Sequence, residues 1–180
     1  MKKLVLSDIA IVGATGLVGS TLLELLEENF FQDSTIHLVA SKKSAGKQLN
    51  FRSSLHEVSD LETFDFSKVQ LALFSAGSNV SHLFAPKAVE AGCIVIDNSS
   101  EFRYQKDIPL IVPEVNLSRL DEFQFPGIIA NPNCSTIQML VALKPIHDAY
   151  KIKRIDVTTM QAVSGTGQAA VQELRDQQSA

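Results

Sequence analysis

Short apolar runs separated by small and polar residues form the main pattern of the chain up to Ala130. Many positions in these runs are β-branched, and each run is too short for a helix, which is typical of buried strands. The predicted strands lie at residues 9–12, 35–40, 69–74, 93–97 and 128–130, with a further short strand at 110–116 that ends at a proline.

Helical periodicity appears between these runs. Residues 17–28 predict a helix whose apolar face is formed by Val18, Leu22, Leu25 and Leu26. A second helix is predicted at about residues 80–90, in which Pro86 either kinks the helix or marks its first turn. Alternating strands and helices predict an α/β fold, here a Rossmann-type, doubly wound and mostly parallel sheet with helices on both faces.

The pattern changes after about residue 131. Apolar residues at helical spacing predict a helix from Cys134 to Leu143, which Lys144-Pro145 kinks or ends. Residues 153–160 alternate like a half-buried strand. A last helix is predicted to start near Thr166, with Ala170, Val171 and Leu174 on its apolar face. We therefore expect one domain at residues 1–131 and the incomplete beginning of an α+β domain at residues 132–180, because the last helix has no clear stop signal.

Composition excludes several classes of function. The chain has 180 residues, is 45% hydrophobic and carries a net charge of −4, without a basic block, so binding to nucleic acid is not expected. No apolar stretch is long enough to span a bilayer, and the apolar part of residues 1–7 is too short for a signal peptide. Cys93 and Cys134 form no CxxC motif or disulfide framework, which favours a reducing cytoplasm. The four histidines are scattered, so no metal site is expected.

A glycine-rich turn follows the first predicted strand directly. Gly13, Gly16 and Gly19 have the spacing GxxGxxG, a variant of the dinucleotide-binding GxGxxG pattern, between a strand and a helix. Gly13 permits a tight turn, Gly16 lets the backbone approach a diphosphate, and Gly19 lets the helix pack against the strand. The N–H groups at the helix start then face the phosphates. The alternative is a tight turn without a ligand.

The loop after the second strand indicates which dinucleotide is bound. An NAD site usually has an Asp or Glu near this position, but this chain has Ser41-Lys42-Lys43-Ser44. Two cations and two hydroxyls suit the 2′-phosphate of NADP, although a solvated basic loop is the alternative. The small residues Ser75-Ala76-Gly77 follow the third strand, where a ligand can approach its carboxyl end.

Cys134 and Arg103 are the remaining candidates for chemistry. Cys134 lies between a proline and an apolar helix, and a helix N-terminus favours a thiolate and offers N–H groups to an oxyanion. A small buried apolar residue is the alternative interpretation. Cys93 lies inside an apolar run and is predicted to be core. Arg103 leaves a strand on a polar loop, where its planar guanidinium suits a phosphate or carboxylate.

Several segments together resemble the aspartate-semialdehyde dehydrogenase family over nearly the whole chain. Two of them are specific, namely Asn-Pro-Asn-Cys-Ser-Thr at 131–136 and Gln-Ala-Val-Ser-Gly at 161–165. The others are the glycine turn, Ser-Ala-Gly at 75–77, Val-Ile-Asp-Asn-Ser-Ser at 95–100 followed by Phe-Arg, and Val-Pro-Glu-Val-Asn at 112–116. The resemblance implies NADPH-dependent reduction of aspartyl 4-phosphate to aspartate 4-semialdehyde with release of phosphate, a step toward lysine, threonine and methionine. It also implies a cytoplasmic homodimer or homotetramer at full length.

The resemblance also implies roles for individual residues. Cys134 would be the nucleophile that forms an acyl-thioester, Gln161 would help to hold the substrate, and Arg103 with Asn133 would bind the acyl phosphate. The implied cofactor contacts are Thr15, Gly16, Leu17 and Val18 at the diphosphate, Lys43 and Ser44 at the 2′-phosphate, and Ser164 and Gly165 beside the nicotinamide. Ser164 and Gly165 should then lie close to Cys134.

Two departures from the family pattern qualify these implications. Lys43 stands where an arginine is often expected, so the 2′-phosphate would meet a point charge instead of a planar fork. The family's catalytic histidine, its carboxylate-binding arginine and a phosphate-binding lysine lie beyond Ala180, so the chain alone is expected to be inactive. Two alternatives stay open: a reductase of N-acetylglutamyl phosphate, and a non-catalytic NADP-binding module.

Overall fold

The computed structural model describes residues 6–28 and 31–179. Most of the segment on which the signal-peptide argument rests, residues 1–5, lies outside this range. None of the described helices is long and apolar enough to cross a membrane.

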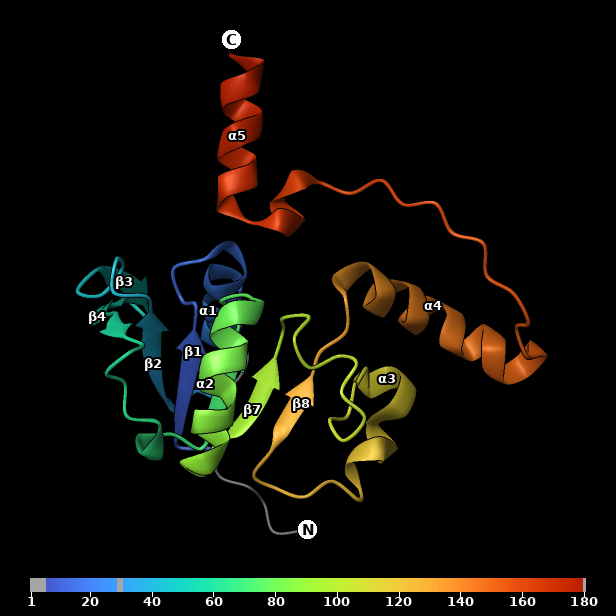
Figure 1. Cartoon of the computed structure of the whole chain (residues 1–180), viewed down its shortest axis with the longest axis horizontal. Coiled ribbons are helices and arrows are strands. Elements are labelled where there is room, and N and C mark those ends of the chain that lie inside the picture. Colours follow the sequence, from blue (N-terminus) through green and yellow to red (C-terminus); the bar gives the residue numbers. More distant parts are fainter. Residues whose placement is uncertain (1–5, 29–30, 180) are drawn as a thin grey trace.

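Within the described residues, a six-stranded parallel sheet forms the centre of the molecule (Figure 1). The strands follow the order β5 (Ser59–Asp60), β2 (Thr35–Ala40), β1 (Asp8–Val12), β6 (Leu71–Phe74), β7 (Ile94–Asp97) and β8 (Ile128–Ala130). The chain proceeds outward from β1 to β5 and then returns to the other side of β1 with β6. This reversal places a switch point between β1 and β6, where ligands bind in open α/β sheets.

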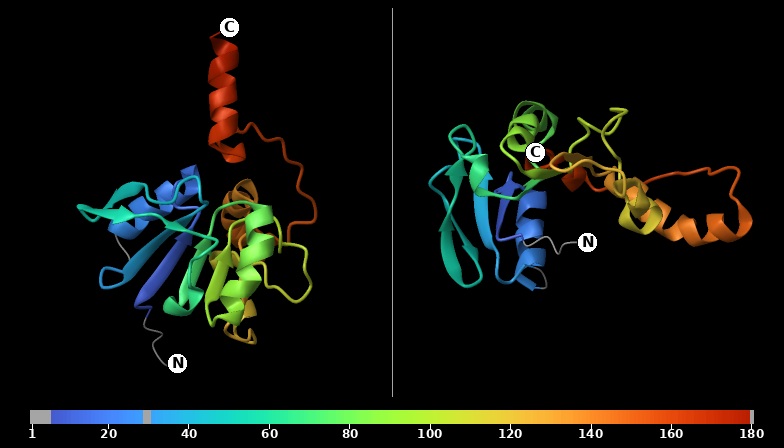
Figure 2. Two further views of the ribbon diagram at one scale, coloured as in Figure 1. Left: turned by 60° about the vertical axis from the view of Figure 1, so that its left-hand side comes forward. Right: turned by 90° about the horizontal axis from the view of Figure 1, so that it is seen from below.

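Two helices cover opposite faces of this sheet (Figures 1 and 2). Side chains alternate between the faces of a strand, so Ile9 and Ile11 of β1 share one core with α1 (Leu17–Glu28). Ala10 and Val12 share the other core with α2 (Ser78–Glu90). Every one of these four β1 residues is fully buried. The predicted doubly wound α/β sheet is confirmed.

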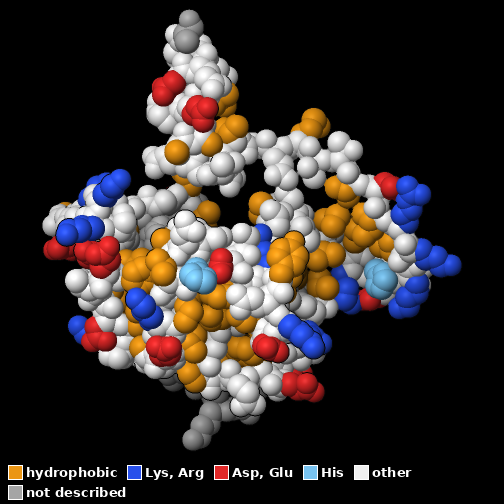
Figure 3. Space-filling model, in the orientation of Figure 1, with side chains coloured by type: hydrophobic (Ala, Val, Ile, Leu, Met, Phe, Trp, Pro, Cys, Tyr) orange, Lys and Arg blue, Asp and Glu red, His pale blue; other side chains and the backbone are white. Residues whose placement is uncertain are grey.

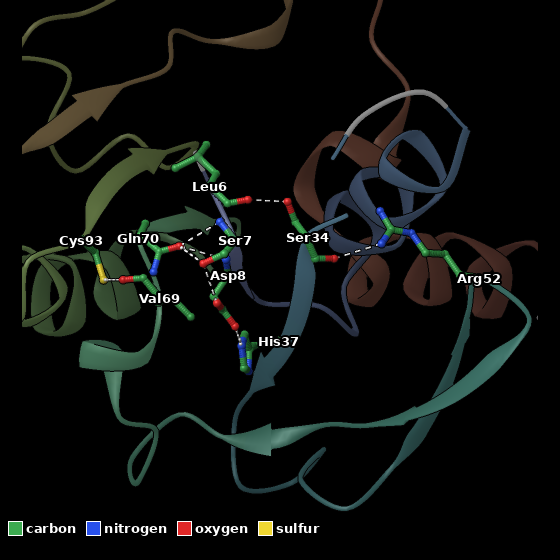
Figure 4. Close-up of polar contacts among 9 residues, drawn as sticks. All are labelled: Leu6, Ser7, Asp8, Ser34, His37, Arg52, Val69, Gln70 and Cys93. Carbon is green, nitrogen blue, oxygen red and sulfur yellow. Dashed lines mark hydrogen bonds and ion pairs between the residues drawn. The ribbon is translucent and has the colours of Figure 1, made fainter. Parts of the chain in front are cut away.

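A hairpin of β3 (Gln48–Phe51) and β4 (Ser54–Glu57) lies outside the main sheet. Arg52 and Ser53 form its turn with φ angles of 50° and 60°, a left-handed pair that matches the twist of two-residue hairpins. The Arg52 guanidinium donates 3.0 Å hydrogen bonds to the carbonyl oxygens of Gln32 and Ser34. Figure 4 shows the bond to Ser34. These bonds hold the hairpin against the chain between α1 and β2.

The amino ends of the central strands are joined by side-chain contacts (Figure 4). Gln70 accepts hydrogen bonds from the backbone N–H groups of Ser7 and Asp8. His37 lies 3.0 Å from the Asp8 carboxylate, and this hydrogen bond holds the pKa of Asp8 below its ordinary value. These groups align β1, β2 and β6 from the edge opposite the glycine turn.

The predicted strand at residues 110–116 is wrong. Only Leu110 makes a β-bridge, to Ala130, and residues Pro113–Asn116 form the short helix α3, followed by a 3-10 turn at Leu117–Leu120. Proline is favoured at the first position of a helix, where its missing N–H is not needed. The Asn116 side chain also accepts a hydrogen bond from the N–H of Val112, which closes the turn.

The predicted apolar face of α1 is partly wrong. Val18 and Leu25 are 45% and 49% exposed, whereas Gly19, Leu23 and Leu26 are buried. Gly19 sets this face because it lies directly against the glycine turn. A Cβ atom on Gly19 would lie 2.2 Å from the Gly13 carbonyl oxygen.

The C-terminal part departs most from expectation. Helix α4 spans Cys134–Tyr150 and continues through Pro145, where we expected it to kink or end. Lys151 caps its C-terminus, with a left-handed φ of 58° that is typical of a helix stop. The expected strand at 153–160 is absent: the described chain there is exposed coil. The last helices are the 3-10 turn η3 (Val163–Thr166) and α5 (Gln168–Gln178).

Replacing Gly19 with alanine should destabilise the protein by about 1–3 kcal/mol, because the added methyl group overpacks the turn. Alanine is the better helix former, so an open position would gain stability instead. The free energy of unfolding in urea measures the difference. Gly165→Ala is the matched control, because a Cβ atom there meets no heavy atom within 4 Å. Equal stability of the two variants would contradict the packing role of Gly19.

Candidate functional site

The glycine turn lies between the carboxyl ends of β2 and β6, the two strands that flank β1. The Gly13 N–H donates to the Val39 carbonyl of β2 over 2.8 Å, and Gly13 has a φ of 93° that other residues rarely adopt. A Cβ atom on Gly13 would lie 2.9 Å from Ser75 Oγ and 3.0 Å from Ala76 N, at the end of β6. The structure therefore brings the glycine turn and the Ser75-Ala76-Gly77 segment together, as expected from the sequence.

The space beside this turn suits a dinucleotide diphosphate. The N-terminus of α1 is open to solvent, since Leu17 and Val18 are 40% and 45% exposed. Gly77 caps α2 with a φ of 89°, and a Cβ atom there would meet no heavy atom within 4 Å. Two helix N-termini thus begin at this edge of the sheet, and their N–H groups favour anions.

The loop after β2 also reaches the glycine turn. Thr15 Oγ1 lies 3.3 Å from Ser44 Oγ, in hydrogen-bond contact. Ser41 and Lys43 are exposed, and Ser41 accepts the N–H of Ser44 to close a turn. The hydroxyls and the cation predicted to meet a 2′-phosphate therefore lie on a loop that contacts the glycine turn.

The loops after β7 and β8 form a second cluster. Arg103 is half-buried, and its Nε donates to the Asn131 carbonyl over 2.9 Å. Its Nη2 donates to the Asn98 carbonyl over 3.1 Å. The Asn131 N–H in turn donates to the Asp97 carbonyl. Arg103 is therefore fixed beside the segment that leads into Cys134.

Cys134 is the first residue of α4 and is exposed. Asn133 caps the helix: its Oδ1 accepts from the N–H groups of Ser135 and Thr136 at 3.1 and 3.3 Å. Two of the N–H groups that we expected to be open to an oxyanion are therefore already occupied. The alternative interpretation of Cys134 as a buried core residue does not apply.

Gln161 lies next to the cysteine although it is distant in the chain. Its Nε2 donates to Ser135 Oγ over 2.9 Å, and Ser135 Oγ is 4.0 Å from Cys134 Sγ. Ser164 and Gly165 follow in η3, above the carboxyl edge of the sheet (Figure 1). Their predicted place beside the nicotinamide stays a prediction.

Cys93 shows what an unreactive cysteine looks like in the same protein. It is fully buried, and its Sγ lies 3.1 Å from the carbonyl oxygens of Phe66 and Val69. Burial raises the pKa of the Cys93 thiol to about 11. The prediction that Cys93 is a core residue is confirmed.

Our reading of the sequence missed a buried polar group below this cluster. Asp97 is fully buried, and its two oxygens accept 2.6 Å hydrogen bonds from Ser81 of α2 and from Ser99. The signal was present, because an acidic residue ends a run of apolar residues there. Within the described residues, no group of His, Cys, Asp and Glu side chains is arranged to hold a metal ion.

Comparison with known proteins decides the family. Residues 8–123 match the semialdehyde dehydrogenase NAD binding domain, and residues 143–180 match the semialdehyde dehydrogenase dimerisation domain. The chain belongs to the semialdehyde dehydrogenase family.

Relatives of this semialdehyde dehydrogenase chain carry a more specific name. It is 58% identical to aspartate-semialdehyde dehydrogenase of Legionella pneumophila, covering 93% of this chain and 48% of that protein. It is similar to the crystal structure of aspartate semialdehyde dehydrogenase II complexed with ASA from Vibrio cholerae, with a TM-score of 0.90, 55% identity and coverage of 94% and 51%. A structure of the Candida albicans enzyme with NADP has a TM-score of 0.73 at 29% identity, covering 89% and 52%. The chain spans about half the length of these relatives.

Iodoacetamide at pH 8 should modify Cys134 in the folded protein and leave Cys93 unmodified, because Cys93 is buried and protonated at this pH. In urea both cysteines should react. Peptide mapping by mass spectrometry measures the modification at each site. Modification of both cysteines at one rate in the folded protein would contradict the assignment.

Proposed function

We propose that this chain supplies the thiol nucleophile and the cofactor-binding domain of an NADPH-dependent aspartate-semialdehyde dehydrogenase. The observation that carries the proposal is the position of Cys134. It is exposed at the start of α4, just after β8, on the edge of the sheet where the glycine turn also lies. A thiol and a dinucleotide turn at one sheet edge suit reduction of an acyl group held as a thioester.

The proposed first step uses groups of this chain. The Cys134 thiolate attacks the acyl carbon of aspartyl 4-phosphate, a carbon–sulfur bond forms, and the carbon–oxygen bond to phosphate breaks. Phosphate leaves with the electron pair, and Arg103, with Asn133 nearby, offsets its charge. Gln161 orients the substrate next to Ser135. The thioester that remains accepts a hydride, which a carboxylate does not.

NADPH, when bound, supplies that hydride. The glycine turn, Thr15 and the first residues of α1 would hold its diphosphate, with Ser75, Ala76 and Gly77 lining the neighbouring strand end. Ser41, Lys43 and Ser44 would contact the 2′-phosphate, and Ser164 and Gly165 would lie beside the nicotinamide. Support comes from the contact between Thr15 and Ser44, which joins the two phosphate-binding segments.

The remaining proposals concern organisation. Residues 1–131 form the cofactor domain, and residues 132–180 begin the catalytic and dimerisation domain. The whole protein is a cytoplasmic homodimer or homotetramer, which the match of residues 143–180 to a dimerisation domain supports. The pathway to lysine, threonine and methionine follows from the activity. The chain by itself is expected to be inactive, since it spans half of its relatives' length.

Turnover of acyl phosphates by the complete protein that contains this chain tests the function. We expect reduction of aspartyl 4-phosphate with NADPH, and none of N-acetylglutamyl phosphate. Cys134→Ser should abolish turnover, because a hydroxyl is a far weaker nucleophile than a thiolate. Cys93→Ala, a change in the core, should keep the activity. Turnover by the Cys134→Ser variant would exclude the thioester mechanism.

Lys43→Ala should weaken binding of NADP by about tenfold and leave binding of NAD unchanged, because a charge-assisted hydrogen bond to the 2′-phosphate is lost. Isothermal titration of the chain with each dinucleotide measures the change. Lys47→Ala is the control, since Lys47 is an exposed cation just beyond this loop. An equal loss of affinity for NADP and for NAD would show that Lys43 does not contact the 2′-phosphate.

A further inference from the structure

The carbonyl groups that hold Arg103 belong to two asparagines that also contact each other. Asn131 Nδ2 donates to Asn98 Oδ1, across the ends of β7 and β8. The backbone carbonyls of the same two residues accept from Arg103 Nη2 and Nε. The three residues therefore form a closed triangle that joins two loops, with one side made by the asparagine side chains and two sides made by Arg103 and the backbone carbonyls.

This triangle uses only part of the arginine. A guanidinium has five N–H groups. Two are used by the asparagine carbonyls, and no acceptor within the described residues takes the N–H groups on Nη1. The backbone bonds fix the plane of the guanidinium while leaving donors for an anion, and a planar fork binds phosphate best in a fixed orientation.

The base of the triangle is also fixed. The loop that carries Asn98 begins at buried Asp97, whose side chain is bonded to Ser81 and Ser99. The Asn131 N–H donates to the Asp97 carbonyl over 2.8 Å, and the Asn98 N–H to the Phe74 carbonyl over 2.9 Å. Both asparagines are half-buried, so water competes weakly for their contact.

We propose that Asn98 and Asn131 are positioning residues, whose side-chain contact orients Arg103 toward an anion bound beside Cys134. The proposal rests on the proposed function, in which Arg103 meets the phosphate. In this role the two asparagines act through Arg103. Their contact keeps the two carbonyls at the spacing that Nε and Nη2 require, so that the free N–H groups point the same way in every molecule.

Protection of Cys134 by inorganic phosphate tests this role. The rate of iodoacetamide modification of Cys134 is measured against phosphate concentration, with ionic strength kept constant by chloride. Phosphate should slow the reaction in the unsubstituted protein, and Arg103→Ala should lose the protection. Asn98→Ala and Asn131→Ala should each raise the half-protecting concentration by about three- to tenfold, the value of one hydrogen bond. Their rates without phosphate should stay within about twofold of the unsubstituted rate.

Asn116→Ala is the matched control. The Asn116 side chain is hydrogen-bonded too, donating to the Leu110 carbonyl and accepting the Val112 N–H, but it lies on α3. This variant should keep full protection, and melting temperatures compare the loss of stability across the variants. A positioning role changes the phosphate dependence, whereas a purely structural role lowers the melting temperature alone.

The outcomes separate the two proposals. If phosphate fails to protect the unsubstituted protein, the anion site at Arg103 is absent, and this part of the proposed function fails together with the positioning role. If Arg103→Ala loses protection while both asparagine variants keep it, only the positioning role is overturned. If one variant unfolds, the other decides, and unfolding of both shows a structural pair and also overturns the role.

Discussion

The site depends on the close approach of the Gly13 turn to the end of β6. Val12 and Ser75 are joined by two hydrogen bonds to the Val12 carbonyl, from Ser75 N–H at 2.8 Å and Ser75 Oγ at 3.1 Å. This leaves no space for a side chain on Gly13. Because all strands of the described sheet run parallel, their carboxyl ends meet at one edge. The loops that follow β1, β2, β6, β7 and β8 therefore all lie at this edge. Their proximity follows from the parallel arrangement of the strands and does not require a separate contact between each pair of loops.

Buried Asp97 fixes the end of β7, on the β6 side of the switch point, as the Gly13 turn fixes the end of β1. A buried carboxylate is costly unless its oxygens are paired, and Ser81 and Ser99 supply the partners. The pairing ties α2 to the end of β7, where the loop to Arg103 begins. The Asp97 carboxylate thus fixes the start of the loop that carries Asn98 and Arg103. An apolar residue at this position would make no hydrogen bond to Ser81 or Ser99 and would leave the loop less defined.

The sequence predicts an element correctly where other elements of this chain bury its apolar residues. Five of the six strands of the central sheet were predicted because their residues are buried by neighbouring elements of the same chain, and the glycine turn because its spacing and context are local. The two-residue edge strand β5 was not predicted, because Ser59 and Asp60 carry no apolar signal. Residues 153–160 alternate like a strand, yet Ile155 and Val157 are 48% and 57% exposed. A strand needs a partner for its backbone, and the described residues provide none there. Helix α4 passes through Pro145 because an exposed helix can leave one carbonyl to water.

The position of the Cys134 thiol is separable from the exposed C-terminal part. Apolar side chains gather over α4 on the right of Figure 3, where Val141 and Ile146 are 38% and 49% exposed. Such a face favours the proposed contact with other chains or domains. Cys134, however, is placed by the N-terminal side: Asp97 accepts from the Asn131 N–H, and Asn133 caps the helix. The thiol is therefore set in place by the parallel sheet and does not depend on the exposed face of α4.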